Sequence, residues 1–168
     1  MQTSLVMTVL GPDRPGLVRT LADVVKAHDG SWLESRMTRL AGQFAGVVRV
    51  ECAADNVDAM AKALAALASE GLTVQTVCEN APETAPRATM RVDVTGNDRP
   101  GIVSELTAAI SAAGGNVEEL VTDLESAPMS GHALFRARGL ISLPQGTENL
   151  AMIAAIERLS SDLTVDIA

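Results

Sequence analysis

The chain has 168 residues, which is enough for one domain or for two small domains. Its formal net charge is −8, and only 2% of its residues are aromatic. This composition disfavours direct nucleic-acid binding, because Lys and Arg hold phosphates and aromatic side chains stack on single-stranded bases. The negative charge also disfavours anionic membranes. Hydrophobic residues make up 47% of the chain, so a packed core is expected.

The first half of the chain alternates short apolar runs with stretches of helical periodicity. Apolar runs rich in branched side chains predict strands, and apolar positions repeated every three or four residues predict helices. One helix is expected from Leu17 to the Asp29-Gly30 stop, and another after Asp55 or Asn56 as its N-cap. The predicted strands are residues 4–10, 31–40, 43–52 and 72–77.

The second half repeats this order after residues 79–88, which contain two prolines and no large apolar residue and are predicted to be a linker. Helical stripes run from Ile102 to Ala113 and from Leu150 to Leu159. The predicted strands are residues 89–95, 116–125, 132–143 and 163–168.

Each half therefore reads β-α-β-β-α-β, which is the split-βαβ order of an α+β, ferredoxin-like fold. The expected domains are residues 1–78 and 89–168, with antiparallel sheets and both helices on one face of each sheet. The other face of each sheet carries apolar side chains, so a partner domain or a second chain is expected to cover it.

Nearly the same eight residues occur between the first strand and the first helix of each half, as GPDRPGLV at 11–18 and GNDRPGIV at 96–103. Asp13 and Asp98 are the predicted N-caps of the two helices. The repeated loop is either a helix start copied by duplication or a repeated binding site.

The prolines and glycines of this loop predict exposed backbone donors. Pro15 and Pro100 suit the first helical turn, where a missing N–H costs nothing. Gly16 and Gly101 have no side chain to shield the next N–H groups, and glycine inside a helix costs about 1 kcal/mol against alanine. The result is a helix N-terminus with a positive dipole end, suited to a carboxylate.

No catalytic constellation or metal-ligand spacing is visible, so neither an enzyme nor a cofactor is expected. His28 and His132 are interpreted as a capping and a solvated histidine, and Cys52 and Cys78 as two small buried thiols. The N-terminus lacks the basic region and the long apolar run of a signal or membrane segment, so a soluble cytoplasmic protein is expected.

The stretches GPDRPGLVRTLADVVKAHDGSW and GNDRPGIVSELTAAISAAGGNV resemble the opening of ACT domains. That family is characterised by a loop of the form G-x-D/N-R-P-G-hydrophobic, a helix, and then G-x-N-hydrophobic at the second strand. Two such repeats without another domain are similar to the glycine cleavage system transcriptional repressor family. The resemblance implies a small amino acid, glycine or serine, as ligand at a domain interface.

The same resemblance implies the ligand-binding residues. The loop N–H groups, the aspartate and the polar residue at the second strand would hold the ligand's carboxylate and amine. The first half departs from the pattern, because Pro12 and Ser31 replace the counterparts of Asn97 and Asn116. The implied residues are Asn97, Asp98, Gly101, Ile102 and Asn116 in the second half, and Gly11, Asp13, Gly16, Leu17 and Ser31 in the first.

The resulting hypothesis is a non-catalytic, homo-oligomeric amino-acid sensor that regulates transcription through a DNA-binding partner. A regulatory subunit of an amino-acid biosynthetic enzyme is the alternative partner relationship. A small acylphosphatase-like hydrolase is a further alternative, because Arg14 and Arg99 lie in the loop where such an enzyme needs an arginine.

Overall fold

A computed structural model describes residues 1–79, 87–126 and 131–167. The chain divides into two compact units, Met1–Glu83 and Thr84–Ala168. The finer domain limits expected from the sequence stay a prediction.

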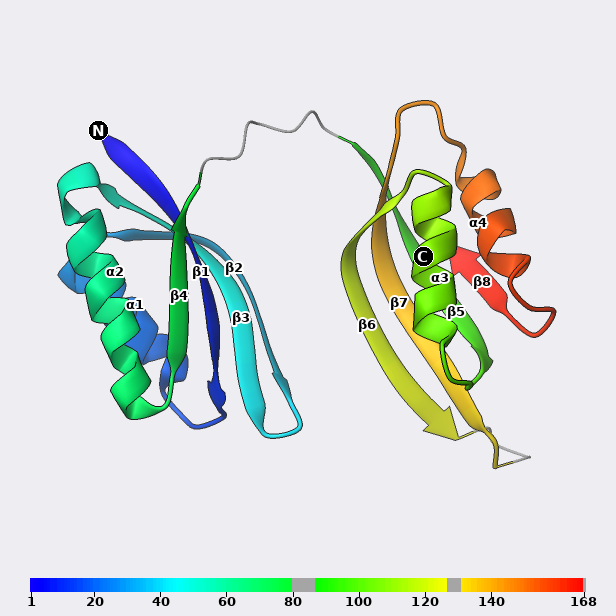
Figure 1. The fold of residues 1–168 in the computed structure, drawn as a ribbon, viewed down its shortest axis with the longest axis horizontal. Helices are drawn as coiled ribbons and strands as arrows, with labels where there is room; N and C mark the ends of the chain where they lie inside the picture. The colour runs from blue at the N-terminus through cyan, green and yellow to red at the C-terminus, as the bar shows by residue number, and fades with distance from the viewer. Residues whose placement is uncertain (80–86, 127–130, 168) are drawn as a thin grey trace. The chain divides into compact units, whose positions relative to one another are not determined.

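The first unit is a four-stranded antiparallel sheet with two helices on one side (Figure 1). Its strand order is β2-β3-β1-β4, so the first strand lies inside the sheet. The turn between β2 and β3 has positive φ at Ala41 and Gly42, as a tight hairpin requires. The elements are β1 Gln2–Pro12, α1 Leu17–Ala27, β2 Ser31–Leu40, β3 Gln43–Ala53, α2 Val57–Ala66 and β4 Thr73–Cys78.

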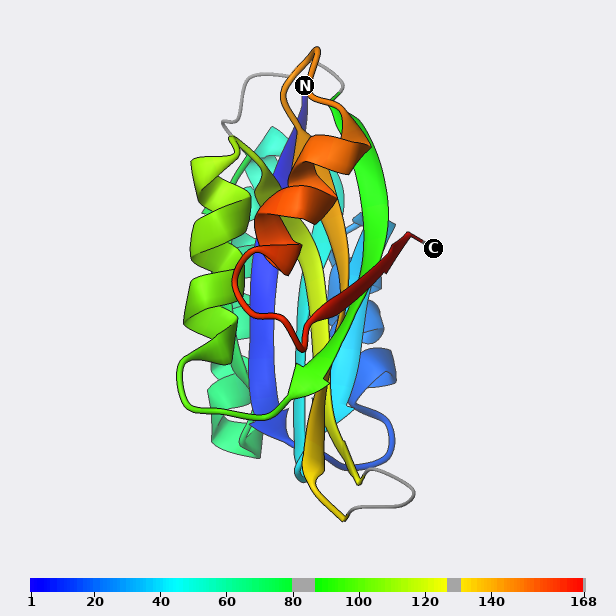
Figure 2. The ribbon, with the colours of Figure 1, turned by 90° about the vertical axis from the view of Figure 1, so that its right-hand side faces the viewer.

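The second unit repeats this arrangement with the strand order β6-β7-β5-β8. In Figure 2 the orange helix α4 lies in front of the strands of this unit, and the yellow-green helix α3 stands at their left. The predicted α+β, ferredoxin-like fold is confirmed in both halves. The elements are β5 Ala88–Asn97, α3 Ile102–Ala112, β6 Asn116–Ser126, β7 Ala133–Leu143, α4 Asn149–Glu157 and β8 Thr164–Ile167.

Each core lies between the helices and one face of the sheet, because alternate strand residues point to that face. On β1 and β5 these buried residues are Leu5, Met7, Val9, Met90, Val92 and Val94. The first helix of each unit meets them with apolar residues spaced four apart, Leu17, Leu21 and Val25 in α1 and Ile102, Leu106 and Ile110 in α3. This packing fixes the position of the loop that enters each helix.

The aspartates of the repeated loop do not cap the helices, so that prediction is wrong. The N-cap positions are Gly16 and Gly101, and neither helix has a side-chain cap hydrogen bond. Asp13 and Asp98 lie three residues before these glycines and continue the strand ends. The backbone N–H of Asp13 donates to the carbonyl oxygen of Gly42, in the turn between β2 and β3, at 2.9 Å. The backbone N–H of Asp98 donates to the carbonyl oxygen of Ala133, at the start of β7, at 3.0 Å.

The glycines of the loop are explained by backbone conformation. Gly16 has a φ of 90° and Gly101 a φ of 87°, in the left-handed region that favours glycine. Pro15 and Pro100 precede these glycines and so lie before the helix, not in its first turn as predicted. The expected cost of glycine inside a helix is absent, because neither glycine lies inside one.

Two smaller expectations change in part, and a third lies mostly outside the described residues. Asn56 is at the N-cap of α2, but its side chain donates to the carbonyl oxygen of His28 at 3.1 Å instead of capping the helix. Cys52 is buried as predicted, whereas Cys78 is exposed at the end of β4. The predicted linker falls mostly on residues 80–86, outside the described residues; Glu79 is still bonded to the first unit through Ser4.

Candidate functional site

A pocket of about 360 Å³ opens at the N-terminus of α3, beside the repeated loop of the second unit. The loop and the first turn of α3 form one wall, and the last part of β6 with the start of β7 forms the other. The lining residues are Asp98, Arg99, Gly101, Ile102, Val103, Ser104, Thr122, Asp123, Leu124 and Phe135. The structure thus brings together three of the predicted site residues.

Residues of the first turn of α3 line this pocket. The N–H of Ile102 donates to the carbonyl oxygen of Arg99 at 3.3 Å. The N–H groups of Val103 and Ser104 have no acceptor within the helix, because they belong to its first turn. Gly101 leaves space there, since an added Cβ would come no closer than 4.0 Å to its nearest neighbour, an oxygen of Glu105. The positive end of the helix dipole and the free donors suit a carboxylate.

Arg99 lines the pocket, but its guanidinium is bonded to a residue of α3. Its guanidinium donates two hydrogen bonds to the Glu105 carboxylate, at 2.7 and 2.6 Å. These bonds lower the pKa of Glu105. In the first unit, Arg14 donates to the carbonyl oxygen of Glu70 at 3.0 Å. Since both loop arginines are already bound to glutamates, the acylphosphatase-like alternative is disfavoured.

The two loop aspartates differ in their charge partners. The carboxylate of Asp13 lies 3.6 Å from a guanidinium nitrogen of Arg39. Among the residues that the structure describes, no ion pair engages the carboxylate of Asp98. Arg39 lies opposite Phe44, and the corresponding position opposite Phe135 is Leu124. The second unit therefore has an apolar wall where the first has an arginine that neutralises the aspartate.

Asn116 lies far from this pocket within its own unit. Asn97 is opposite Leu134 at the start of β7, while Asn116 is opposite Ser142, eight residues further along the strand. Eight residues of strand span roughly 26 Å. The first unit has the same separation, with Ser31 opposite Glu51 and the end of the loop strand opposite Gln43. Asn116 and Ser31 reach such a pocket only from another domain or another copy.

The local environment of Asn116 also engages its side chain. Its amide donates to the Glu118 carboxylate at 2.8 Å, and the buried Ser142 hydroxyl donates to the same oxygen at 2.6 Å. These two hydrogen bonds, with the Ser142 bond the stronger influence, lower the pKa of Glu118. Asn116 is exposed, so its amide remains accessible beside this cluster.

The chain matches the ACT domain family over residues 3–79 and 89–167. This chain belongs to the ACT domain family. Both matched segments coincide with the two βαββαβ units, so the chain is a tandem of ACT domains. ACT domains are regulatory domains that bind small ligands such as amino acids. The chain is therefore an ACT-domain regulatory protein.

Two solved structures resemble the tandem ACT chain over its full length. A protein of unknown function from Galdieria sulphuraria is 28% identical, with 99% of this chain and 98% of that chain covered and a TM-score of 0.81. A protein provisionally described as a glycine cleavage system transcriptional repressor is 17% identical, with coverage of 100% and 97% and a TM-score of 0.75. No relative was found among curated protein sequences.

The other predicted site residues of the ACT units lie in the strand and the helix that flank each loop. Gly11 is buried in β1, Leu17 is buried at the start of α1, and Ile102 is its buried counterpart in α3. Asn97 donates its backbone N–H to the Asp162 carboxylate at 2.9 Å. Asp162 has a lowered pKa, first because of the Ser160 hydroxyl and then because of this N–H.

Sequence reasoning missed the second wall of the ACT pocket. Thr122, Asp123, Leu124 and Phe135 come from β6 and β7, which follow the loop and α3 in the chain. Only the spacing that places Leu124 opposite Phe135 in a hairpin signals this wall, because neither residue belongs to the loop motif. Within the described ranges, no helix is long and apolar enough to span a membrane.

Proposed function

We propose that this ACT-domain protein senses a small amino acid at the pocket beside α3 and regulates transcription through a DNA-binding partner. The observation that carries the proposal is one pocket that combines the first-turn N–H donors of α3, an apolar wall and the Asp98 carboxylate, which has no ion-pair partner among the described residues. These groups complement the three chemical parts of an amino acid.

The carboxylate of the ligand would bind the N–H groups of Val103 and Ser104 at the positive end of α3. Its ammonium group would face the carboxylate of Asp98, which has no competing cation among the described residues. Leu124 and Phe135 would border the side chain. Glycine or serine is proposed as the ligand, following the resemblance of the loop motif.

Control of transcription is proposed through a partner, not through direct contact with DNA. The net charge of −8 opposes phosphate binding. The full-length likeness to a protein provisionally described as a glycine cleavage system repressor supports a regulator of this kind. The two proteins are 17% identical, so the identity of the partner has to come from an experiment.

Amino-acid binding is tested by thermal unfolding of the full chain against each of the twenty amino acids. A ligand present at 100 times its Kd stabilises a protein by about 2.7 kcal/mol, which a melting curve resolves. We expect glycine or serine to raise the Tm. Absence of a shift with all twenty amino acids contradicts the sensor proposal.

The matched variants Asp98→Ala and Asp13→Ala assign binding to one unit. Asp98→Ala should weaken calorimetrically measured binding at least tenfold, because the ammonium group loses its counter-charge. Asp13→Ala should leave the affinity unchanged, since Arg39 already pairs with that carboxylate. The reverse result would place the site in the first unit.

Asn116→Ala tests whether another domain or copy completes the site. Because Asn116 lies at the far end of its own sheet, loss of binding indicates that a neighbouring surface supplies this amide. Retained binding indicates that one unit suffices.

The partner is tested by affinity capture with and without the amino acid. The captured protein should shift a labelled DNA fragment in a gel, and the amino acid should change the amount captured. Capture of an amino-acid biosynthetic enzyme whose activity responds to the ligand would instead favour the regulatory-subunit alternative.

A further inference from the structure

The repeated loop of the second unit borders another cavity besides the pocket at α3. This cavity has a volume of about 310 Å³ and is lined by Asn97, Asp98, His132 and Ala133. Asp98 lines both cavities, so it lies between them. Of the four lining residues, Asp98 and His132 are the two with titratable side chains. His132 is exposed, as expected for a solvated histidine, but it shares this cavity with the loop aspartate.

Strand pairing holds His132 next to Asp98. β5 and β7 are paired up to Asn97 and Leu134. One residue further, the backbone N–H of Asp98 donates to the carbonyl oxygen of Ala133 at 3.0 Å. His132 directly precedes Ala133, so this hydrogen bond fixes the backbone of His132 beside the loop.

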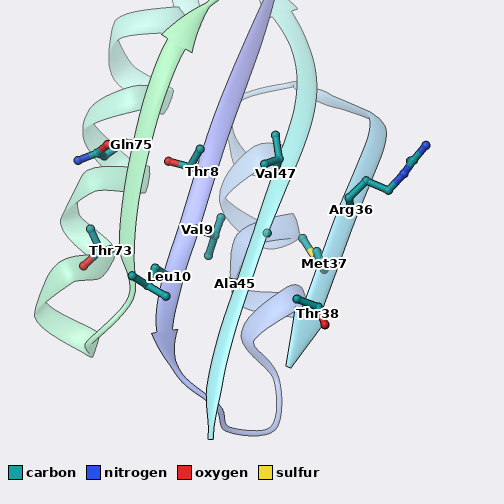
Figure 3. A pocket seen from close by; sticks show the side chains of 11 residues that line it. Thr8, Val9, Leu10, Arg36, Met37, Thr38, Ala45, Val47, Thr73 and Gln75 are labelled. Carbon is teal, nitrogen blue, oxygen red and sulfur yellow. The ribbon is translucent and has the colours of Figure 1, made fainter. Parts of the chain in front are cut away.

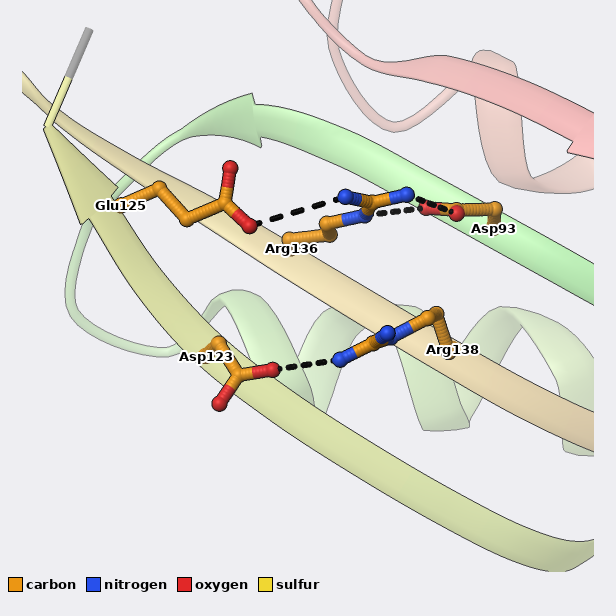
Figure 4. A network of polar contacts seen from close by, with 5 residues as sticks. All are labelled: Asp93, Asp123, Glu125, Arg136 and Arg138. Carbon is orange, nitrogen blue, oxygen red and sulfur yellow. Dashed lines mark hydrogen bonds and ion pairs between the residues drawn. The ribbon is translucent and has the colours of Figure 1, made fainter.

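The other charged groups around Asp98 are bonded to partners of their own. Arg99 donates two hydrogen bonds to Glu105 of α3, and these bonds lower the pKa of Glu105. Of the described charged residues around the loop, His132 is the one whose charge changes near neutral pH. The acidic groups of the neighbouring elements are bonded as well, with Asp123 of β6 to Arg138, Glu125 of β6 to Arg136 (Figure 4), and Asp162 before β8 to the backbone N–H of Asn97.

The first unit has a permanent charge at the equivalent loop. The two repeats align on a buried glycine and a buried phenylalanine, Gly11 with Gly96 and Phe44 with Phe135. In this alignment Ala41 replaces His132, and Asp13 lies 3.6 Å from a guanidinium nitrogen of Arg39. Arginine is always charged in proteins, whereas histidine titrates between about pH 5 and pH 8. The charge beside the first loop is therefore permanent, and the charge beside the second depends on pH.

The large cavity of the first unit does not involve its loop aspartate. It measures about 630 Å³ and lies on the sheet face that the helices do not cover (Figure 3). Thr8 and Ala45 line it, and the same alignment places them at the positions of Asp93 and Arg136. Asp13 does not line it. The cavity that borders the second loop is therefore not a copy of this larger cavity.

We propose that protonation of His132 weakens amino-acid binding at the pocket beside α3. This inference rests on the proposed function, in which the carboxylate of Asp98 faces the ammonium group of the ligand. Neutral His132 does not compete with that group, whereas an imidazolium is attracted to the same carboxylate and repels a second cation. The cavity is about as wide as the Debye length in physiological salt, about 8 Å, so these charges are only partly screened from each other.

Calorimetry of the full chain with glycine and with serine, at pH 7.5 and at pH 5.5, tests the proposal. A free amino acid keeps both of its charges over this range, so a change in Kd comes from the protein. Wild type should bind about fivefold more weakly at pH 5.5, the lower end of a typical coupling between two sites.

Two substitutions of His132 separate its charge from its shape. His132→Asn should match the Kd of wild type at pH 7.5 and lose the pH dependence, because its side chain does not titrate. His132→Lys carries a permanent charge, so it should bind about fivefold more weakly than wild type at pH 7.5 and show no further loss at pH 5.5.

His28→Asn is the matched control, because the chain contains two histidines. His28 lies at the end of α1 in the first unit, and its Nδ1 is 2.9 Å from the carbonyl oxygen of Val24. This variant should keep the pH dependence of wild type. Far-UV circular dichroism at both pH values confirms that each variant is folded.

NMR titration of the two imidazoles without any amino acid tests the influence of Asp98 separately. The variants His132→Asn and His28→Asn assign the signals, because each removes one of them. Asp98→Asn should lower the midpoint pH of the His132 titration, since the imidazolium loses its counter-charge, and leave that of His28 unchanged. Saturating glycine should lower the same midpoint in wild type by about 0.7 pH unit, which is the fivefold change in affinity expressed for the histidine.

The outcomes distinguish this inference from the proposed function. An equal Kd at both pH values in wild type, or a pH dependence that persists in His132→Asn, would overturn the inference and leave the proposed function in place. A His132 midpoint that does not respond to Asp98→Asn would overturn the inference whether or not an amino acid binds. If neither amino acid binds at either pH, the proposed ligand is wrong and the inference is overturned with it.

Discussion

The two ACT units share one core and differ on their surfaces. Leu21 of the first unit corresponds to Leu106 of the second, and both are almost completely buried. On the open sheet faces, by contrast, Thr8 and Ala45 stand where the second unit has the ion pair of Asp93 and Arg136. The entering loops differ too, because Asp13 has an arginine partner and, within the described ranges, Asp98 has none.

This difference shows that the buried residues and the surface residues of a duplicated domain are under different constraints. The core is constrained because close packing penalises any change of volume. An open face or a loop aspartate has no such constraint, so each copy is free to acquire a different partner. In this chain the uncovered sheet face has Thr8 and Ala45 in the first unit and the Asp93–Arg136 ion pair in the second, and the second unit has a pocket beside Asp98.

Core truncation gives the largest expected effect and tests whether the cores are equivalent. Leu21→Ala and Leu106→Ala should each cost about 2–5 kcal/mol of unfolding free energy, because each leaves a cavity. Urea titration of the full chain measures both losses. Trp32 lies in the first unit, so its fluorescence reports that unit, whereas far-UV circular dichroism reports both. Costs that differ by more than about 2 kcal/mol would break the equivalence of the cores.

A glycine comparison tests the strand ends beside the two loops. A Cβ on Gly11 would lie 2.6 Å from the backbone carbonyl oxygen of Gly71, which cannot move independently of its chain. A Cβ on Gly96 would lie 2.5 Å from a methyl group of Leu163, whose side chain can rotate. Gly11→Ala should therefore cost about 1–3 kcal/mol and Gly96→Ala less. The same urea titration measures both, and equal costs would contradict this distinction.

The smallest expected effect is the pH dependence that the Asp93–Arg136 pair gives to the second unit. Hydrogen bonds from Arg136 hold the pKa of Asp93 below its usual value. A carboxyl group with a lowered folded-state pKa contributes stability above its unfolded pKa, near 4, and loses it as the pH falls further. The corresponding Thr8 of the first unit does not titrate.

The variant Arg136→Met isolates this contribution. Urea midpoints measured between pH 6 and pH 3 should fall less steeply for Arg136→Met than for wild type. The contribution is small because the ion pair is partly exposed and solvent screens it. Asp93→Asn is the complementary control and should flatten the profile in the same way. An unchanged slope in both variants would show that the pair does not stabilise the unit.

Much of the fold could be predicted from the residue pattern. Alternating apolar residues such as Met90, Val92 and Val94 indicate a strand with one buried face, and the four-residue spacing of Ile102, Leu106 and Ile110 indicates a helix. The first residue of each helix is harder to predict from sequence, because Asp and Pro are typical of a helix N-terminus and Gly is not. Here the left-handed glycine, not the aspartate, is the residue from which each first helix begins.

The sequence by itself determined the duplicated βαββαβ order, the apolar stripes and the glycine-containing loops, because these depend on contacts between near neighbours in the chain. Only the tertiary structure decided the surroundings of each loop. Sheet register placed Leu124 and Phe135 beside Asp98, placed Arg39 beside Asp13, and put Asn116 at the far end of its strand. It also placed Thr8 beside Val47 in the first sheet and Asp93 beside Arg138 in the second, on the faces that the helices do not cover. Such groupings depend on which strands lie side by side, and periodicity within a single strand does not contain that information.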